Sequence, residues 1–345
     1  MKLALHVRHL GDLREARALV HDLESAGLDV INVSESYTFD AVSQVGYLAA
    51  ITERVEIATT ILNVFSRSAA AIAMTAASCD ALTGGRFVLG LGTSGPQVIE
   101  GFHGIPYEKG IDRIHDYIEV TRKVLRREPL EHTGPTVTIP FPSAVPGESR
   151  RPLKLINHPV RSRVPIWWAA ITGRAVETAA EVADGWLPAW FIPDQIDKVY
   201  GARLSAGRSR RSPELGPLEI SAGVAVGLGE DPEAVADSLR PGLALYVGGM
   251  GSRATNYYNR LGIRYGYAEE AALMQELYLG GRRAEAEAAV PREWIGAMTI
   301  AGSRQQAGER LAAYRDAGVT VLDVNPYGGD AVRTIAGLRE LVDAF

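Results

Sequence analysis

The stretch RFVLGLGTSGPQ, residues 86–97, decides between two folds. It places Gly90, Gly92 and Gly95 in the order G-x-G-x-x-G directly after an apolar run that is typical of a strand. In a dinucleotide-binding loop the third glycine leads straight into a helix, and an acidic residue about 20 residues on ends the next strand. Here a proline follows Gly95, the predicted helix begins only near Asp112, and the acidic residues at that distance lie inside it. We therefore exclude a Rossmann loop; the glycines either let the backbone approach a flat ligand closely or only form a tight turn.

Apolar runs of this kind recur along the chain and alternate with segments of helical period. The predicted strands are 2–7, 26–35, 55–61, 86–92, 164–170, 184–189, 218–227 and 319–325. The predicted helices are 12–25, 67–82, 112–127, 174–183, 193–207, 304–317 and 330–343. Eight strands that alternate with helices favour an α/β fold, the (β/α)8 TIM barrel, in which the strand ends and the loops after them form the active face. A doubly wound sheet is the alternative, but it usually needs fewer strands.

Two segments interrupt this alternation. Residues 128–163 are rich in proline, glycine and threonine, which predicts an irregular or hairpin insertion. Residues 227–300 carry additional helical patterns. No linker separates two domains, so we expect one barrel domain over residues 1–345 from which both insertions project.

Composition narrows the classes of function. A hydrophobic fraction of 46%, a charged fraction of 22% and a net charge of -5 describe an ordinary globular protein without a broad basic surface for nucleic acid or an anionic membrane. No apolar run approaches the ~20 residues of a membrane span. The one cysteine, Cys79, cannot form an internal disulfide, which fits a reducing compartment, and the histidines lack metal-ligand spacing. We expect a cytoplasmic protein without a metal site.

Several stretches of the chain resemble a known superfamily. They are LVHDLESAGLDVINVSESY, AMTAASCDALTGGRFVLGLGTSGPQVIEGFHGIPY, AAEVADGWLPAWF, LYVGGMGSRATNYYNRLGIRYGY and AGSRQQAGERLAAYRDAGVTVLDV. The sequence resembles the bacterial luciferase-like superfamily, and within it the coenzyme F420-dependent oxidoreductases related to methylenetetrahydromethanopterin reductase. The resemblance implies a TIM barrel whose C-terminal mouth holds the deazaflavin coenzyme F420, which carries hydride, facing a substrate pocket.

The resemblance also implies which residues surround the coenzyme. Those expected to bind or support it are Ser36, Thr60, Ile61, Thr93, Ser94, Gly95, Ala169, Ala170, Ile171, Thr172, Gly173, Arg174 and Arg253. The Thr60–Ile61 bond corresponds to a non-proline cis peptide behind the ring, although an ordinary strand end is the alternative. Thr172, Gly173 and Arg174 open a predicted helix, where amide groups and the dipole favour a phosphate. Either arginine is equally compatible with a surface ion pair.

Two residues are candidates for proton chemistry. Glu35 corresponds to an acidic position over the ring, where it would bond the ring edge or relay a proton, unless it is a solvated loop residue. His6 stands where the related pterin reductases have a first-strand glutamate, so it either acts as acid or base or packs inside the barrel. His103 and Trp190 are expected to border the substrate pocket.

Three functions remain open. The preferred one is hydride transfer between coenzyme F420 and a small organic or pterin-like substrate. An FMN-dependent monooxygenase of the same superfamily is the second. A cofactor-free binding relative is the third, although the sequence keeps the small residues at strand ends that such a protein is expected to lose. The family suggests a homodimer, with a small-molecule substrate as the other partner and no nucleic acid or membrane.

Overall fold

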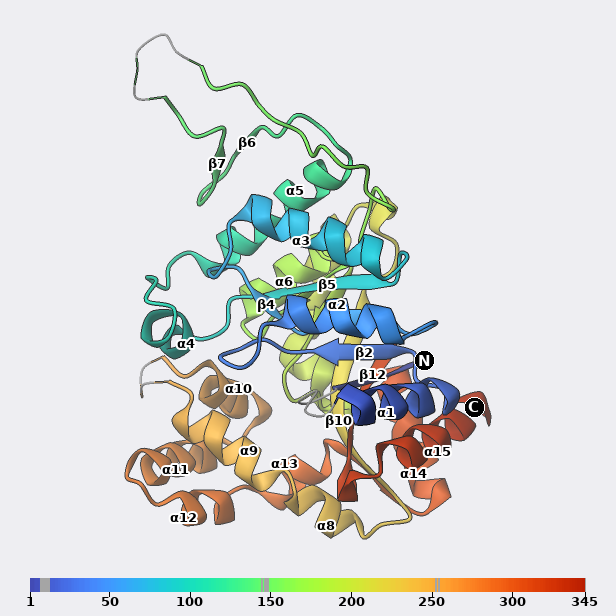
Figure 1. Ribbon diagram of the computed structural model, residues 1–345. Coiled ribbons are helices and arrows are strands. Elements are labelled where there is room, and N and C mark those ends of the chain that lie inside the picture. The colour runs from blue at the N-terminus through green and yellow to red at the C-terminus, as the bar shows by residue number, and fades with distance from the viewer. Residues whose placement is uncertain (7–12, 144, 146–148, 252, 254, 345) are drawn as a thin grey trace.

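The computed structural model describes residues 1–6, 13–143, 145, 149–251, 253 and 255–344. Eight parallel strands form a closed ring, in which each pairs with the next and the last pairs with the first (Figure 1). They are β1 (Lys2–His6), β2 (Val30–Val33), β3 (Glu56–Thr59), β5 (Phe87–Gly92), β8 (Ile166–Ala169), β9 (Gly185–Leu187), β10 (Glu219–Leu228) and β12 (Val321–Pro326). The predicted TIM barrel is confirmed. The last residue of the predicted strand 2–7 and the first of the predicted helix 12–25 lie outside the described residues.

Helices surround this barrel on the outside. The barrel helices are α1 (Leu13–Ser25), α2 (Ala41–Ile51), α3 (Ala69–Leu82), α5 (Gly110–Leu125), α6 (Gly173–Val182), α7 (Ala202–Arg210), α14 (Arg304–Asp316) and α15 (Ala331–Ala344). The sequence did not predict α2, although Asp40 caps it by accepting a hydrogen bond from the Ser43 amide at 2.7 Å. The predicted helix 193–207 is wrong in its first half, because a 3₁₀ turn (Pro193–Gln195) and a π turn (Asp197–Gly201) precede α7.

The barrel interior is filled in layers. Six strands contribute one buried side chain each to the middle layer, namely Ala4, Val30, Ala58, Val88, Trp167 and Val321. The Trp167 ring needs Gly185 opposite, because a Cβ there would lie 2.3 Å from the indole Cδ1. At the N-terminal end, the Lys2 ammonium lies 2.7 Å from Glu56 and 3.7 Å from Glu219. The Trp167 indole donates to Glu219 at 2.9 Å, so charged groups and an aromatic ring close this end.

The first two glycines of the opening motif lie inside β5 and not in a turn, so the tight-turn interpretation is wrong. A Cβ on Gly90 would lie 1.8 Å from the Thr59 carbonyl oxygen, and one on Gly92 would lie 2.9 Å from the Ile61 side chain. The short strand β4 (Leu62–Asn63) follows on the same edge and pairs with the end of β5. These glycines therefore let the end of β3 press directly against β5.

Gly95 has a different role, because it precedes a short helix, α4 (Pro96–Gly101). The expectation that no helix begins before Asp112 is therefore wrong: α4 intervenes, and α5 itself begins at Gly110. The exclusion of a dinucleotide loop stands, since α4 has only six residues and no acidic strand end follows it.

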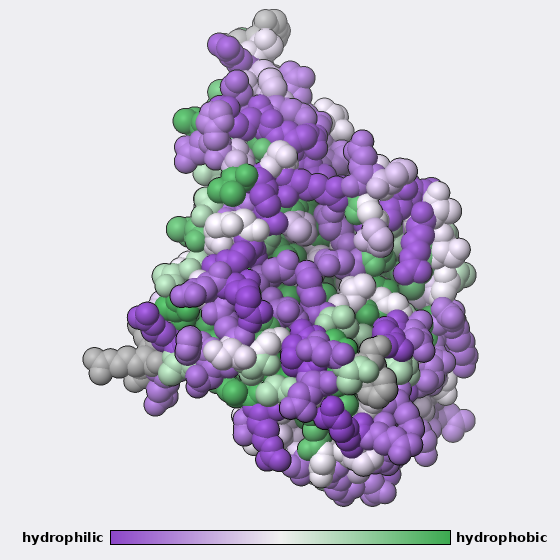
Figure 2. Space-filling view, turned by 90° about the vertical axis from the view of Figure 1, so that its right-hand side faces the viewer, coloured by the Kyte–Doolittle hydropathy of each residue, from purple (hydrophilic) through white to green (hydrophobic). Residues whose placement is uncertain are grey.

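The first insertion contains a hairpin of β6 (His132–Thr133) and β7 (Thr138–Ile139). It is fixed to α5 through buried Asp116, which accepts from the Thr136 amide at 2.8 Å, the Thr136 hydroxyl at 2.6 Å and His132 Nε2 at 2.9 Å. Residues 140–163, here called the arm, then run to β8 without a helix or strand in their described part and project beyond the body (Figures 1 and 2).

The second insertion forms a cluster of short helices at the opposite end of the molecule (Figure 1). They are α8 (Pro232–Asp237), α9 (Arg240–Ala244), α10 (Tyr257–Tyr265), α11 (Ala268–Leu279), α12 (Arg283–Ala288) and α13 (Arg292–Gly296), with a π turn at Leu245–Gly249. The insertion ends in an additional strand that the sequence did not predict, β11 (Thr299–Gly302), which pairs with the end of β10. Shorter 3₁₀ turns occur at Pro213–Leu215 and Tyr327–Gly329. Among the described helices, none combines the length and apolar character of a membrane span.

Candidate active site

Polar side chains replace the apolar ones where the strands approach the C-terminal mouth of the barrel. Because side chains on a strand alternate, His6 and Asn32 stand on the same face as Ala4 and Val30, which fill the interior. His6 is paired in register with Asn32, and Asp323 is paired with Ala4. Three adjacent strands, β12, β1 and β2, therefore supply an acid, a histidine and an amide to the interior face near the mouth.

Within the described part of the chain, two of the polar groups at this mouth are buried without a hydrogen-bond partner. Asn32 is 1% exposed, and neither its amide nitrogen nor its oxygen has a hydrogen-bond partner among the described residues. The Thr60 hydroxyl is likewise buried and unpaired within the described chain. A buried polar atom without a partner costs about 1–3 kcal/mol, so such atoms mark places where a ligand or an ordered water binds. Asn32 was not among the residues predicted from the sequence. Its position two residues beyond Val30 nevertheless indicates a polar side chain that points inward.

His6 is held at both ring nitrogens. Its Nε2 lies 3.0 Å from the Asp323 carboxylate, and its Nδ1 lies 3.3 Å from the Ser34 hydroxyl. Ser34 also donates to the Thr60 carbonyl oxygen at 3.0 Å. The side chain of His6 remains 29% exposed, which leaves it accessible from the mouth.

This chain of contacts can take up and release one proton. A serine hydroxyl has one hydrogen, so when Ser34 donates to Thr60 it can only accept from His6 Nδ1–H. The Asp323 carboxylate accepts from Nε2–H, and His6 then carries both protons. When the Nδ1 proton passes to the Ser34 oxygen, Ser34 releases its own hydrogen to an acceptor at the mouth, and the new hydroxyl hydrogen can then be donated to Nδ1. The arrangement thus suits a proton donor and acceptor whose ring orientation is fixed.

Glu35 lies just beyond the end of β2, as the sequence suggested, but it is a buried ion-pair partner and not a solvated loop residue. It is 7% exposed, and its two oxygens accept from the two terminal nitrogens of Arg67 at 2.8 and 2.9 Å. The Ala41 amide donates to it as well, at 3.3 Å, and Arg67 also reaches Asp40 at 2.7 Å. These contacts support a structural ion pair between the β2 loop and the start of α3, and they do not support a proton relay.

Three of the residues assigned to the site have left-handed backbone conformations. Ser36, Ser94 and Trp190 have φ of 47°, 54° and 46°. Non-glycine residues in this region are uncommon and gather at ligand sites, so their joint appearance at the ends of β2, β5 and β9 is consistent with a binding mouth. The Thr60–Ile61 peptide is cis, as the resemblance implied.

The loop after β5 is tied together by Tyr107. Its hydroxyl donates to the Thr93 hydroxyl at 2.9 Å, and Thr93 in turn donates to the Ser94 carbonyl at 3.2 Å. Burial raises the pKa of Tyr107, so its hydroxyl keeps its proton and remains a donor. His103 lies in the same region, with its Nε2 3.4 Å from the Asn63 amide on β4. The predicted loop residues are therefore brought together, and Gly95 closes the group at the start of α4.

The segment after β8 presents small side chains and a helix start. The Ala170 carbonyl accepts from the Trp186 indole at 2.9 Å, and the Ile171 carbonyl accepts from the Tyr200 hydroxyl at 2.9 Å and from Arg264 at 2.6 Å. These bonds fix the backbone from Ala169 onward, with the Ala170 side chain buried and Ala169 partly exposed.

α6 begins at Gly173 directly after this segment. Thr172 precedes it without a capping side-chain bond, so the first amides of this ten-residue helix are available to an anion. Arg174 is 73% exposed and lies 3.2 Å from Asp112, and Arg253 is also exposed. The structure thus places Arg174 beside the helix start, in a surface ion pair.

Trp190 connects the barrel to the second insertion. Its ring centre lies 5.1 Å from Tyr258, 5.8 Å from Trp294 and 6.0 Å from Tyr246, and its carbonyl accepts from the Tyr265 hydroxyl at 2.8 Å. The inserted helices therefore reach the loop after β9 through an aromatic cluster. The sequence predicted Trp190 as a site residue but not its partners Tyr246, Tyr258 and Trp294.

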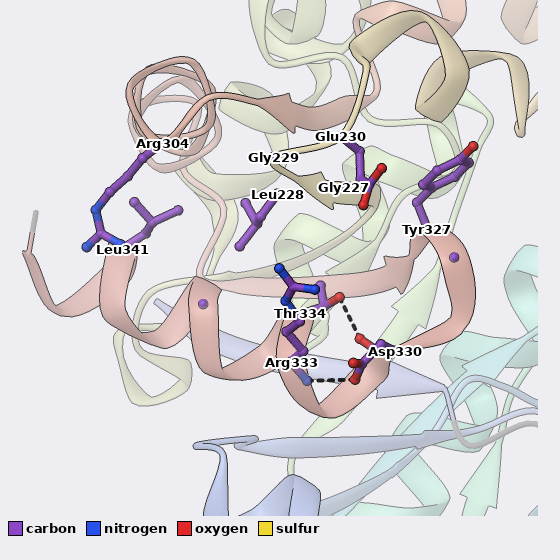
Figure 3. A pocket seen from close by; sticks show the side chains of 12 residues that line it. Gly227, Leu228, Gly229, Glu230, Arg304, Tyr327, Asp330, Arg333, Thr334 and Leu341 are labelled. Atoms are coloured by element: carbon purple, nitrogen blue, oxygen red, sulfur yellow. Dashed lines mark hydrogen bonds between the residues drawn. The ribbon is translucent and has the colours of Figure 1, made fainter.

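A separate cavity of about 510 Å³ lies where β10 and β12 meet α15 (Figure 3). Its polar contacts are those of a helix cap, with the Asp330 carboxylate accepting from the Arg333 amide at 3.0 Å and its carbonyl accepting from the Thr334 hydroxyl at 2.7 Å. Arg304, which also lines it, pairs with Glu340. None of the predicted site residues lines this cavity, so it does not bear on the mouth.

The fold and the mouth define the class: a (β/α)8 barrel whose strand ends converge on buried polar groups, the face on which such barrels bind ligands. The chain belongs to the luciferase-like monooxygenase family, whose model matches residues 3–321. It is 34% identical over 348 residues to a Mycobacterium tuberculosis protein provisionally named a coenzyme F420-dependent oxidoreductase, a match that covers 98% of this chain and 99% of the relative.

Solved structures of other proteins share the fold, among them two F420-dependent enzymes. The coenzyme F420-dependent tetrahydromethanopterin reductase from Methanopyrus kandleri superposes with a TM-score of 0.80 at 19% identity, covering 100% of this chain and 99% of that one. An F420-dependent secondary alcohol dehydrogenase in complex with an F420–acetone adduct superposes with a TM-score of 0.74 at 15% identity, covering 99% and 98%. At 19% and 15% identity, the two superpositions show a shared architecture alone.

Proposed function

We propose that this protein is an oxidoreductase that transfers hydride between the deazaflavin coenzyme F420 and a small organic or pterin-like substrate at the barrel mouth. The observation that carries the proposal is the buried amide of Asn32, which has no hydrogen-bond partner among the described residues and lies beside a histidine that can exchange a proton. The name of the 34% identical mycobacterial relative supports F420 as the coenzyme.

The residues present fit this coenzyme. A flat ring needs polar atoms at its edge and small side chains beside it, and the mouth offers the unpaired Asn32 and Thr60 atoms together with the Ala169–Ile171 segment. The remaining proposed contacts come from Ser36, Ile61, Thr93, Ser94 and Gly95. A phosphate would lie at the uncapped start of α6, at Thr172 and Gly173, with Arg174 and Arg253 toward the acidic tail. When bound, the coenzyme supplies the hydride that the side chains of the protein cannot.

The protein supplies the proton and the geometry. Because Asp323 and Ser34 hold both ring nitrogens of His6, we assign the proton exchange with the substrate heteroatom next to the reacting carbon to His6 acting through the Ser34 hydroxyl: Ser34 gives its hydrogen to the heteroatom as it takes one from Nδ1, or the reverse. Asp323 is a positioning residue that keeps the imidazole in one orientation and balances its charge, and Ser34 completes the path to its second nitrogen. His103 and Trp190 are the proposed side walls of the substrate pocket.

A second candidate is an FMN-dependent monooxygenase, because the family model is named for monooxygenases. The two candidates differ in the ring that the mouth accepts. A fluorescence titration of the purified protein with coenzyme F420 and, separately, with FMN distinguishes them. We expect binding of F420 with a preference of at least tenfold; preference for FMN would favour the monooxygenase, and binding of neither would refute both.

Two variants connect this titration to the structure. Asn32→Leu removes the unpaired amide at the mouth, so we expect at least tenfold weaker F420 binding and unchanged or higher thermal stability of the free protein. Ser221→Ala is the matched control, since the Ser221 hydroxyl is also buried and unpaired among the described residues but belongs to the layer of Val321. It should leave binding unchanged; equal weakening by both variants would contradict the placement of the ring at Asn32.

A further inference from the structure

The arm exposes large apolar side chains. Phe141, Leu153, Ile156 and Val160 are 74%, 77%, 88% and 57% exposed. Figure 2 shows a body surface that is mainly hydrophilic on the face in view, with the arm standing beyond it. Single exposed apolar residues are common, but four along one projecting segment are typical of an interaction surface.

The body of the protein holds the arm in this conformation. The Leu130 amide donates to the Leu153 carbonyl at 2.8 Å, and Arg127 donates to the Leu155 carbonyl at 3.2 Å. At the base, Arg161 Nε donates to the fully buried Asp80 at 3.0 Å. Because these bonds fix the backbone, the apolar side chains stay outside and do not fold back onto the body.

The arm lies next to an exposed apolar part of α3. Asp80, the partner of Arg161, belongs to α3, and a Cβ on Gly85, just after this helix, would lie 3.9 Å from Val160. α3 itself exposes Met74 and Leu82, at 57% and 63%. A two-fold axis through such a face would bring each arm onto α3 of the other copy, as an isologous interface requires.

The charge distribution favours a second copy as the occupant. Residues 149–163 carry five Lys and Arg and no Asp or Glu, which leaves 31 Lys and Arg against 41 Asp and Glu for the rest of the chain. A basic arm on an acidic body is complementary to another copy of itself.

We propose that the arm is a dimerization element that packs Phe141, Leu153, Ile156 and Val160 against α3 of a second copy of this chain. The dimer suggested by the resemblance would then be held by the first insertion and α3, and not by the helices at the rim of the barrel. This proposal does not depend on the coenzyme or the reaction.

Sedimentation velocity on the full chain over a concentration series tests this interface. We expect the wild type to sediment at twice 37.1 kDa. The double variant Leu153→Asp/Ile156→Asp should weaken dimerization at least 100-fold, since it places two charges in an apolar interface. Its circular dichroism should match the wild type, because both residues are more than three-quarters exposed.

Two further variants make the outcome decisive. Met74→Asp on α3 should dissociate the dimer as well, whereas Ile263→Asp/Leu279→Asp, on α10 and α11 at the opposite end of the molecule, should not (Figure 1). A dimeric arm variant would overturn the proposal, and a dimeric Met74→Asp variant would overturn the α3 contact. A monomeric wild type that pellets with anionic phospholipid vesicles would replace the second copy with a membrane surface, and one that does not pellet would also refute the proposal.

Discussion

Replacing Gly90 by alanine tests why the G-x-G spacing stands at the end of β5. A Cβ at this position would lie 1.8 Å from the Thr59 carbonyl oxygen, where carbon and oxygen normally approach no closer than about 3.3 Å. The end of β3 would have to move by about 1.5 Å. That movement would break the bonds that the Thr59 hydroxyl makes with Gly90, accepting from its amide at 2.9 Å and donating to its carbonyl at 3.1 Å.

The expected cost follows from these two effects. Overpacking costs about 1–3 kcal/mol, and two lost hydrogen bonds add about 1 kcal/mol each, so Gly90→Ala should lower the free energy of unfolding by roughly 3–5 kcal/mol. Urea denaturation followed by the fluorescence of the buried tryptophans measures this loss. The same displacement moves Thr60, so F420 binding should weaken as well.

Gly95→Ala is the control for this variant. Gly95 has φ of -117°, which alanine adopts without strain, and a Cβ there would meet nothing within 4 Å. Its free energy of unfolding should therefore stay within about 1 kcal/mol of the wild type. Equal losses in the two variants, or a Gly90→Ala protein as stable as the wild type, would refute the packing explanation of the motif.

Three further variants address the site and the charges around it. Asp323→Asn should lower kcat about 10- to 100-fold, from the loss of a charge-assisted hydrogen bond of about 1.5–3 kcal/mol, while the Kd of F420 changes less than threefold; an unchanged kcat would remove Asp323 from the proton path. Arg67→Ala leaves the buried Glu35 carboxylate without its main partner and should cost about 3–5 kcal/mol in urea unfolding, most of it recovered when Glu35→Gln is added. Burial raises the pKa of Asp116, but the hydrogen bonds from the β6–β7 hairpin outweigh it and hold that pKa below its ordinary value of 3.8. Its contribution to stability is therefore complete above pH 3.8 and lost as the pH falls through the lowered value, so Asp116→Asn should be roughly 2 kcal/mol less stable at pH 7, with a difference that narrows below about pH 4 in thermal unfolding.

The sequence predicts the barrel well because each barrel strand is an apolar run bounded by turn residues. It fails for short or uniformly apolar elements. β11 has four residues and α4 has six, too few to show a period. α2 is apolar on nearly every side, so no single stripe marks it as a helix.

The site is predictable only in part, for a physical reason. Asn32 and Asp323 follow from alternation along strands that are already predicted, and a reading of inward polar positions at strand ends would have found both. The ion pair of Glu35 with Arg67 joins positions 32 residues apart, and nothing in the local sequence of either one indicates the other. Matching a residue such as Glu35 to a family position therefore predicts where its side chain lies. Its chemical role depends on its bonding partner, here Arg67, which the match does not reveal.

The barrel is closed at its N-terminal end. Trp167 and the Lys2, Glu56 and Glu219 charges fill the N-terminal end, so the proposed ligands would reach His6 and Asn32 from the C-terminal mouth. If the coenzyme and the substrate both bind at the mouth, as the proposed function requires, the molecule that lies deeper has to arrive first and depart last. Steady-state kinetics with two varied substrates should therefore show a compulsory order of binding. The molecule nearer the mouth should block dissociation of the other.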